Sequence, residues 1–380
     1  MSKKVALLIE TSNAYARDLL RGIHSFIKEN THWSIFMGEF SRGECHPEWL
    51  NDWKGDGIIA RIENKEMAEI IKKANLPTID VSSGRFIPSI PWVETDDKAI
   101  AKLVFEHLTS CGFKNFAFCG VPYNWSNWRQ EHFTKLLKEK NYNLFNYHFS
   151  EKNAGEKWNT QLDQLAEWLK TLPKPIGIFA SYDNLGRQII ETCQLAGIYV
   201  PEEVAIIGVD NDELICDLCK PRLSSISTDP FRIGYLAAEM LNQTMLGEKL
   251  VNTEIRVKPI QVVKRKSTDI KAIHDPIISE ALHYIHENAL KGALTIEEII
   301  KNIPTSRRVF EVRFKKAIGR TPFEEILRLK INRIKELLIE TDMTLLEISE
   351  RAGIEHQSYM GYIFKKEMGI SPSLYRKQHR

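Results

Sequence analysis

Apolar residues follow two alternating patterns along the first 265 residues. Short continuous runs rich in Val, Ile and Phe predict buried strands, at residues 5–10, 33–40, 57–62, 77–82, 115–121, 144–150, 175–181 and 204–210. Stretches with helical periodicity, such as 14–29 and 98–110, stand between most of them. Strand, helix and strand in repetition predict parallel sheets with helices on both faces. This segment is long for one open sheet, so we predict two lobes with a cleft between them.

The last hundred or so residues show helical periodicity only. Residues 295–322 and 344–372 each contain an amphipathic helix, a break and a second helix rich in basic and polar residues, and they end alike in FKKAIGRTP and FKKEMGISP. Helix, turn and helix is the shape that fits the major groove of DNA. The repeat therefore predicts two helix-turn-helix units. The alternative, a generic helical bundle with solvated basic faces, does not explain the repetition.

A polar segment at 266–276, closed by Pro276, separates the two patterns. We place the boundary near Thr268, so that the domains are 1–268 and 269–380. Between the two repeats, a helix of 19 residues is expected from Phe323 to Thr341. It would be roughly 28 Å long, close to the ~34 Å of one DNA turn. Such a helix can set two recognition helices in successive major grooves.

The second helix of each repeat supplies the candidate DNA contacts. Arg and Gln suit base edges, whereas Lys and some Arg side chains suit phosphates. We expect Tyr359 and Ile363 to pack inward. The candidates that face outward are Ser306, Arg307, Arg308, Arg313, Gln357, Ser358, Tyr362, Lys365 and Lys366.

Composition changes this picture little. The chain has 380 residues, 43% hydrophobic and 27% charged, and a formal net charge of +2, so a global basic excess cannot argue for nucleic acid. The basic residues are concentrated locally, since six lie between Arg307 and Arg320 with one acid, Glu311. No segment reaches the ~18 to 20 apolar residues of a membrane span, and the N-terminus lacks a signal-peptide pattern. Six cysteines are too sparse for a disulfide scaffold, so we expect a cytoplasmic protein.

Enzyme and metal motifs are missing from the sequence. It contains no GxGxxG after the first strand, no GxxxxGK[ST], no GxSxG and no HExxH. The lone CxxC at Cys216 and Cys219 and the pair His283 and His286 lack further ligands. We therefore expect no catalysis, no cofactor and no metal.

Parallel sheets bind ligands beyond the carboxyl ends of their strands. The residues there are acids, amides, hydroxyls, aromatics and an arginine, a mixture that suits a sugar. The alternative is that they are only helix caps and loops. They include 11–13, Arg61, 80–83, 122–129, 182–184 and 210–212.

Several of these segments resemble the ligand-binding core of LacI-type repressors, which is related to periplasmic sugar-binding proteins. They are GVDND (208–212), IDVSS (79–83), WRQEHF (128–133), ASYDN (180–184) and PRLSSISTDPFRIGYLAAEML (221–241). The resemblance implies ligand contacts from Asp210 and Asp80, a sugar-chelating Arg129, and a dimerising helix after Asp229. Thr228 and Tyr182 stand where that family often has Gln and Asn, so the ligand is not carried over.

The tail resembles the AraC-type DNA-binding domain, through SRRVFEVRFKKAIGRTPFEEI (306–326) and FKKEMGISPSLYRKQ (364–378). Two departures are Pro304 at the turn glycine of the first unit and Gly361 inside the second recognition helix. A LacI-like front before an AraC-like tail, with AYARDLLRG at 14–22, is similar to the xylose-responsive transcriptional activators of bacteria.

That resemblance implies a dimeric activator that senses D-xylose or a related pentose, closes its lobes on the sugar, repositions its tails on operator DNA and contacts RNA polymerase. The candidate ligand residues are Asn13, Tyr15, Asp80, Trp128, Arg129, Tyr182, Asp183 and Asp210. Three alternatives stay open: the same regulator with another ligand, a sugar-processing enzyme with an accessory DNA-binding tail, and a constitutive DNA binder whose front domain only dimerises.

Overall fold

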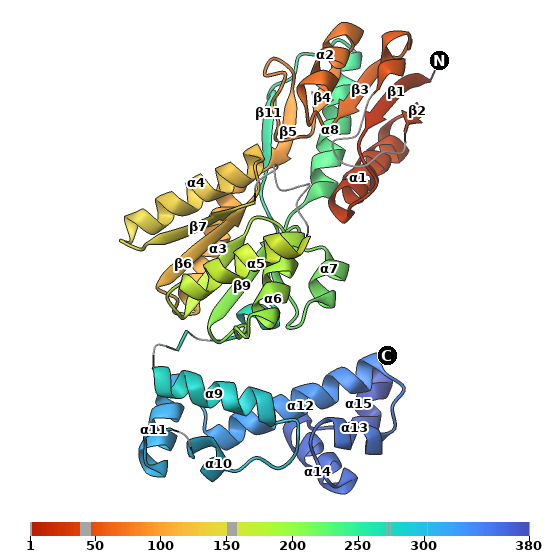
Figure 1. The fold of residues 1–380 in the computed structure, drawn as a ribbon. Coiled ribbons are helices and arrows are strands. Elements are labelled where there is room, and N and C mark those ends of the chain that lie inside the picture. Colours follow the sequence, from red (N-terminus) through yellow and green to blue (C-terminus); the bar gives the residue numbers. More distant parts are fainter. Residues whose placement is uncertain are drawn as a thin grey trace. The chain divides into compact units, whose positions relative to one another are not determined.

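The computed structural model describes residues 2–38, 47–149, 158–270, 272–273, 275–301 and 303–379. The chain divides into two compact units, Met1–Ile270 and Lys271–Arg380 (Figure 1). Among the described residues, no helix is long and apolar enough to cross a membrane.

The first unit contains two six-stranded sheets. The sheet of lobe 1 has the order β11-β5-β4-β3-β1-β2 and is parallel throughout. Its strands are β1 (Lys3–Leu8), β2 (Trp33–Met37), β3 (Gly57–Ala60), β4 (Thr78–Asp80), β5 (Trp92–Thr95) and β11 (Glu254–Val257). The helices of this lobe are α1 (Ala14–Asn30), α2 (Lys65–Ala74) and α8 (Pro230–Met245), with the short helix η1 (Glu48–Asn51).

The sheet of lobe 2 has the order β12-β10-β9-β8-β6-β7, and only β12 runs antiparallel to its neighbour. Its strands are β6 (Asn115–Gly120), β7 (Leu144–His148), β8 (Ile176–Ala180), β9 (Val204–Val209), β10 (Ser224–Ser227) and β12 (Gln261–Val263). Its helices are α3 (Asp97–Ser110), α4 (Asn124–Glu139), α5 (Trp158–Thr171), α6 (Asp183–Leu195), α7 (Glu213–Leu218) and η3 (Lys266–Thr268).

The predicted parallel architecture is confirmed, and each of the eight apolar runs contains a strand. Residues 39, 40 and 150 of those runs lie outside the described residues. Two further strands, β11 and β12, follow each other closely in sequence, with Pro259 between them, but belong to different sheets. Together with the passages from β5 to α3 and from β10 to α8, this gives three connections between the lobes.

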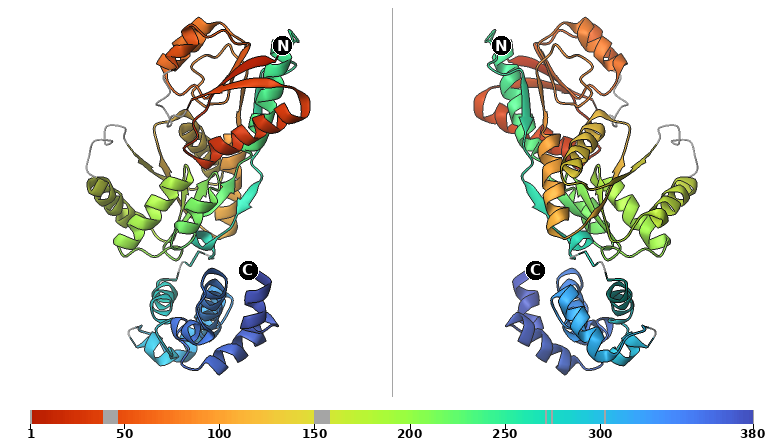
Figure 2. Two further views of the ribbon diagram at one scale, coloured as in Figure 1. Left: turned by 90° about the vertical axis from the view of Figure 1, so that its right-hand side faces the viewer. Right: turned by 90° about the vertical axis from the view of Figure 1, so that its left-hand side faces the viewer.

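Helices α1 and α8 lie side by side on lobe 1 (Figure 2). They approach closely because each has a glycine at the crossing. A Cβ on Gly22 would collide with the Phe231 carbonyl, and a Cβ on Gly234 would collide with the Leu19 carbonyl. No larger residue fits at either position without moving a helix.

The described residues of the second unit form helices joined by turns and loops, with no strand among them. It contains α9 (Pro276–Asn288), α10 (Ile296–Ile300), α11 (Arg307–Ile318), α12 (Pro322–Glu340), α13 (Leu345–Arg351), α14 (Gln357–Met368) and α15 (Pro372–His379). The connecting helix α12 has the predicted 19 residues. A core of Ile334, Ile348, Met360 and Phe364 joins α12 to the second helix-turn-helix unit.

Candidate functional site

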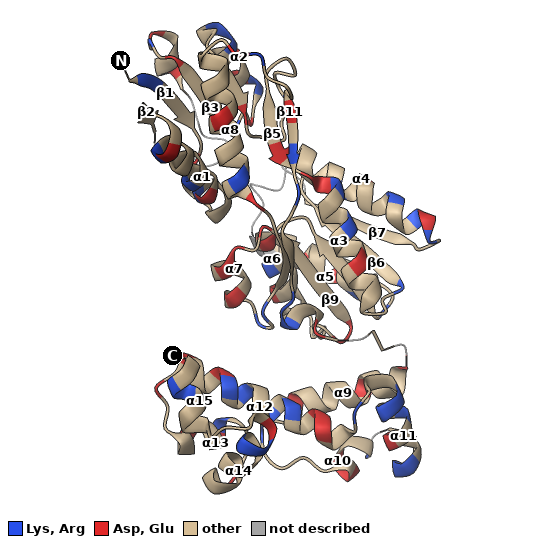
Figure 3. Ribbon diagram, turned by 180° about the vertical axis from the view of Figure 1, so that it is seen from behind, with Lys and Arg blue, Asp and Glu red and all other residues tan. Residues whose placement is uncertain are grey.

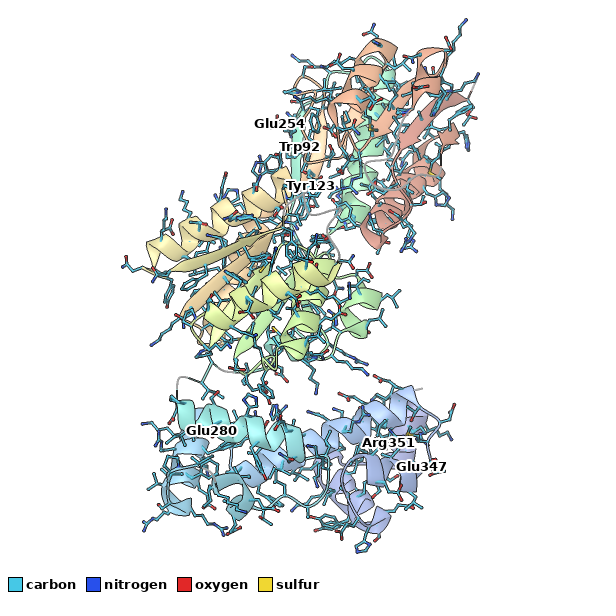
Figure 4. The ribbon with its side chains drawn as sticks, in the orientation of Figure 1. Trp92, Tyr123, Glu254, Glu280, Glu347 and Arg351 are labelled. Atoms are coloured by element: carbon cyan, nitrogen blue, oxygen red, sulfur yellow. The ribbon has the colours of Figure 1, made fainter. Side chains whose placement is uncertain are left out.

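A cavity of about 810 Å³ lies between the two lobes of the first unit. Tyr123, which is labelled in Figure 4, is part of its wall. Lobe 1 contributes the N-terminal parts of α1 and α8, the end of β5 and the segment after β3. Lobe 2 contributes the loops after β6, β8 and β9 and the N-terminal part of α4. The residues that line the cavity include Asn13, Tyr15, Arg61, Glu94, Thr95, Asp97, Trp125, Arg129, Tyr182, Asp183, Asp210 and Asn211.

Arg129 is the central charged group of this cavity. Its Nε donates to Asp97 Oδ1 at 2.7 Å, and its NH1 group donates to the Ser181 carbonyl at 2.5 Å. Burial raises the pKa of Asp97, and the Arg129 charge opposes that rise. A guanidinium has five N–H donors in a rigid fork, so a fixed Arg129 can still present donors to a ligand hydroxyl.

Aromatic rings form the wall beside Arg129. The Arg129 guanidinium lies over the Trp125 ring, 4.8 Å from its centroid. Tyr123 stacks on Trp125 with an interplanar angle of 8°, and Tyr182 meets it edge-on at 5.7 Å. Flat aromatic faces next to a hydrogen-bonding arginine suit the apolar and polar sides of a sugar ring.

The lobe 1 wall is held by a buried polar network. Tyr15 donates its hydroxyl hydrogen to Glu94 Oε1 at 2.7 Å, and Arg61 lies over the Tyr15 ring. Arg61 NH1 is 2.5 Å from Glu10 Oε1. Burial and the Glu94 charge raise the pKa of Tyr15, which keeps its phenol protonated. The network fixes the orientation of Tyr15 and Glu94 at the cavity surface.

Asp183 lines the cavity, but both of its oxygens already accept hydrogen bonds. Ser225 Oγ donates to Oδ1 at 2.6 Å, and the Asp212 N–H donates to Oδ2 at 2.8 Å. Burial, and then the charge of Asp210, raise the pKa of Asp183 to about 8. Asp183 therefore holds the loop after β9 in place.

Six of the eight predicted ligand residues line the cavity: Asn13, Tyr15, Arg129, Tyr182, Asp183 and Asp210. Asn13 is also the N-cap of α1, because its Oδ1 accepts from the Ala16 N–H at 2.8 Å.

Asp80 and Trp128 lie outside the cavity lining, which corrects their predicted placement. Asp80 is fully buried, and its Oδ1 accepts from the Ser82 backbone at 2.9 Å and hydroxyl at 2.7 Å. Trp128 packs edge-on against Trp92 at 6.2 Å. Trp125, in the first turn of α4, takes the place predicted for Trp128.

In the second unit, the two repeats fold through the same local signals. Thr295 and Thr344 each form a capping box, with Glu298 and Glu347 respectively. The recognition helices α11 and α14 both have 12 residues and end at a glycine, Gly319 or Gly369, with φ of 83° or 76°. The turn of the first unit, at Pro304, includes Asn302, which lies outside the described residues.

The exposed face of α14 contains the predicted Gln357, Ser358, Tyr362, Lys365 and Lys366. Tyr359 is also exposed, at 51%, whereas Met360 is fully buried. The prediction that Tyr359 packs inward is therefore wrong, because α14 buries the next residue along.

Figure 3 shows several Lys and Arg positions along α11. The predicted residues of this helix differ in their surroundings. Ser306 is the exposed N-cap, and Arg308 is exposed with no ion pair to a described residue. Arg307 instead pairs with Glu297 and, at 3.0 Å, with Glu311. Arg313 makes a forked pair with Asp275 at 2.7 to 3.0 Å. Of these arginines, Arg308 best fits base contact.

Two exposed valines of α11 were not predicted as candidate contacts. Val309 and Val312 are 48% and 64% exposed. They occupy the positions of Tyr359 and Tyr362 when the two repeats are aligned on their FKK motifs. This alignment was the signal that could have identified them.

A two-lobed binding-protein fold with a cavity between its lobes, followed by two helix-turn-helix units, defines a DNA-binding transcription regulator with a small-molecule sensor. Three families match along the chain: an XylR N-terminal domain at 4–98, a periplasmic binding protein-like domain at 105–268 and a helix-turn-helix domain at 300–378.

Whole-length relatives agree with this division. The chain is 33% identical to the xylose operon regulatory protein of Haemophilus influenzae, over 98% of each chain. It is 32% identical to that of Escherichia coli K12, over 98% of this chain and 96% of the relative. A solved structure of a xylose-binding transcription activator, xylR, superimposes with a TM-score of 0.82 at 31% identity, covering 100% of this chain and 99% of that one. The chain belongs to the family of xylose operon regulatory proteins.

Proposed function

We propose that this protein is a xylose-responsive activator of pentose utilisation genes. Its cavity would bind D-xylose between the lobes, and its two helix-turn-helix units would bind operator DNA. The observation that carries the proposal is Arg129, which is buried, paired with Asp97 and seated on the Trp125 ring at the cavity surface. The whole-length similarity to regulators named for xylose supports the choice of sugar.

In this mechanism, the sugar joins residues of both lobes. Tyr15 and Glu94 would bind it from lobe 1, and Arg129 and Asp210 from lobe 2. A ligand that makes contacts to both lobes only when they close favours the closed form by the free energy of those contacts. Closure would then change the spacing of two tails in a dimer. Dimerisation and contact with RNA polymerase rest on the family resemblance, as does activation.

The chain would act by binding and not by catalysis, with no cofactor, and in the cytoplasm where its DNA target lies. Its DNA contacts would come from Arg308 for bases and from Lys365 and Lys366 for phosphates.

Isothermal titration of the full chain with D-xylose, L-arabinose, D-ribose and D-glucose tests the ligand. We expect saturable heat with D-xylose and little with D-glucose. No heat with D-xylose contradicts the proposed sugar. If chromatography detects conversion of any of these sugars by the protein, that result favours an enzyme. Analytical ultracentrifugation tests the dimer, and a DNA-binding assay with and without sugar distinguishes a regulated from a constitutive DNA binder.

A further inference from the structure

The chain leaves the first unit through a segment that is fixed to the sheet of lobe 2. We define the exit segment as Arg265 and η3, residues 265–268. Ser267 and Thr268 are fully buried. Ser267 Oγ donates to the Ile206 carbonyl at 2.6 Å, and Thr268 Oγ1 is 2.8 Å from both His107 Nε2 and Ser224 Oγ. The exit segment is therefore packed against the sheet of lobe 2, beside β9 and β10.

A strained turn borders the cavity at the end of β9. Asp210 and Asn211 have φ of 100° and 52°, which non-glycine residues rarely adopt. Such a conformation persists only where the surrounding structure holds it. The Asn211 N–H donates to Ser225 Oγ at 3.0 Å. Both residues line the cavity, so the turn is within reach of a ligand bound there.

Arg265 joins the strained turn to the exit segment. Its NH1 group donates to Asn211 Oδ1 at 2.9 Å and to the Leu223 carbonyl at 3.1 Å. Its Nε lies 3.5 Å from Asp217 Oδ1 on α7. Its backbone N–H donates to Ser224 Oγ at 2.8 Å. The side chain is 14% exposed and does not line the cavity.

The far end of the linker is also tied to a functional element. Asp275 caps α9 through its Oδ1, which accepts from the Ile277 N–H at 3.1 Å. The same carboxylate holds Arg313 of the recognition helix α11 in the forked pair described above. The first helix of the second unit, α9, thus begins at a residue that positions the first helix-turn-helix unit.

We infer that Arg265 is the positioning residue that couples the sugar cavity to the DNA-binding unit. This inference rests on the proposed function. A sugar that contacts Asp210 or Asn211 shifts the strained turn, and Arg265 transmits the shift to η3, from which the chain continues to the second unit. Arg265 contributes to the coupling and not to the affinity for either partner.

The test uses the full chain, D-xylose, and a DNA duplex selected by the protein from a random-sequence pool. The DNA dissociation constant is measured with and without D-xylose, for the unmodified protein, Arg265→Met and Lys264→Met. Lys264 is the matched control, because it is the adjacent residue and its Nζ contacts Asp269 at 2.9 Å. For the unmodified protein and Lys264→Met we expect a sugar effect of about 5-fold or more, within the usual range of coupling.

For Arg265→Met we expect the sugar effect to fall below about 2-fold, while the D-xylose affinity stays within about 2-fold of the original. A full sugar effect in Arg265→Met overturns the inference. An unmodified protein that binds neither sugar nor DNA, or shows no sugar effect, contradicts the proposed function itself.

Hydrogen exchange of the unmodified protein keeps the inference testable if Arg265→Met does not fold. D-Xylose should change the protection of residues 210–212 and 265–268 together. A change confined to 210–212 would overturn the inference without any variant.

Discussion

Replacing Lys330 with Met should destabilise the second unit selectively. Lys330 lies on α12 and is only 9% exposed. Its Nζ donates to the Gly292 carbonyl at 2.8 Å and to the Gly353 carbonyl at 2.6 Å. These carbonyls belong to the loop before the first helix-turn-helix unit and to the turn of the second. One ammonium group therefore binds both helix-turn-helix units to α12, the helix that connects them.

The magnitude follows from the two hydrogen bonds. Each bond to a charged donor contributes roughly 1.5–3 kcal/mol, and an orphaned carbonyl costs a similar amount. Met fills the same volume and gains some burial of apolar surface, which offsets part of the loss. We expect a net loss of about 3 kcal/mol. For a unit of about 100 residues this lowers the unfolding temperature by on the order of 10 °C.

Two spectroscopic probes distinguish the unfolding of the first compact unit from that of the second in one sample. All eight tryptophans lie at or before Trp168, so tryptophan fluorescence reports on the first unit. Circular dichroism at 222 nm follows helix in both units. We expect Lys330→Met to create or shift a transition seen by circular dichroism and to leave the fluorescence transition unchanged. Lys335→Met, on the same helix, is the control. A shift for Lys330→Met that is no larger than the control's refutes the reasoning.

Three further predictions concern binding and pH. Trp125→Ala should weaken D-xylose binding about 10-fold or more, through loss of the aromatic wall, whereas Trp128→Ala should leave it nearly unchanged; equal losses in calorimetry would contradict the cavity assignment. Measured by fluorescence anisotropy, Arg308→Ala should reduce the free energy of DNA binding by about 1–3 kcal/mol and alter base preference. Lys366→Ala should weaken binding to all DNA sequences alike and lower the salt slope by about 1. The reverse pattern would exchange the roles of the two residues. Burial raises the pKa of Glu325, but its hydrogen bonds and surrounding basic groups lower it to about 2 from the ordinary 4.5, so its stabilising effect is present above pH 4.5 and is lost as the pH falls toward 2. Acid unfolding followed by circular dichroism should show this loss in that window, and Glu325→Gln should cost about 3 kcal/mol at pH 7 and show less pH dependence there.

Patterns local in sequence predicted most of the fold. Buried parallel strands are apolar throughout, and each helix-turn-helix unit has its own capping box and glycine end. Strand β5 was not predicted, because it has only four residues and one of them is a glutamate. Glu94 is buried there and accepts a hydrogen bond from Tyr15, which is 79 residues away in sequence. A local sequence pattern cannot predict such a partner.

The candidate sites show the same limit. Trp125 and Trp128 are one helical turn apart on α4. Trp125 is the one near the end of β6, because α4 begins at Asn124, and the sequence did not predict that start. The ion pairs of Arg307 and Arg313 depend on acids in α10 and before α9. A basic helix in a sequence therefore overstates the number of arginines available to DNA.

The glycine crossing of α1 and α8 has a consequence for ligand size. Because Gly22 and Gly234 each face the backbone of the other helix, we expect the two helices to move together. Both begin at the cavity, so we expect the distance between their first turns to stay the same whichever molecule enters. A bulkier guest could be accommodated only by displacement of the opposite wall, and relaxing the selectivity of this pocket should start with substitutions there.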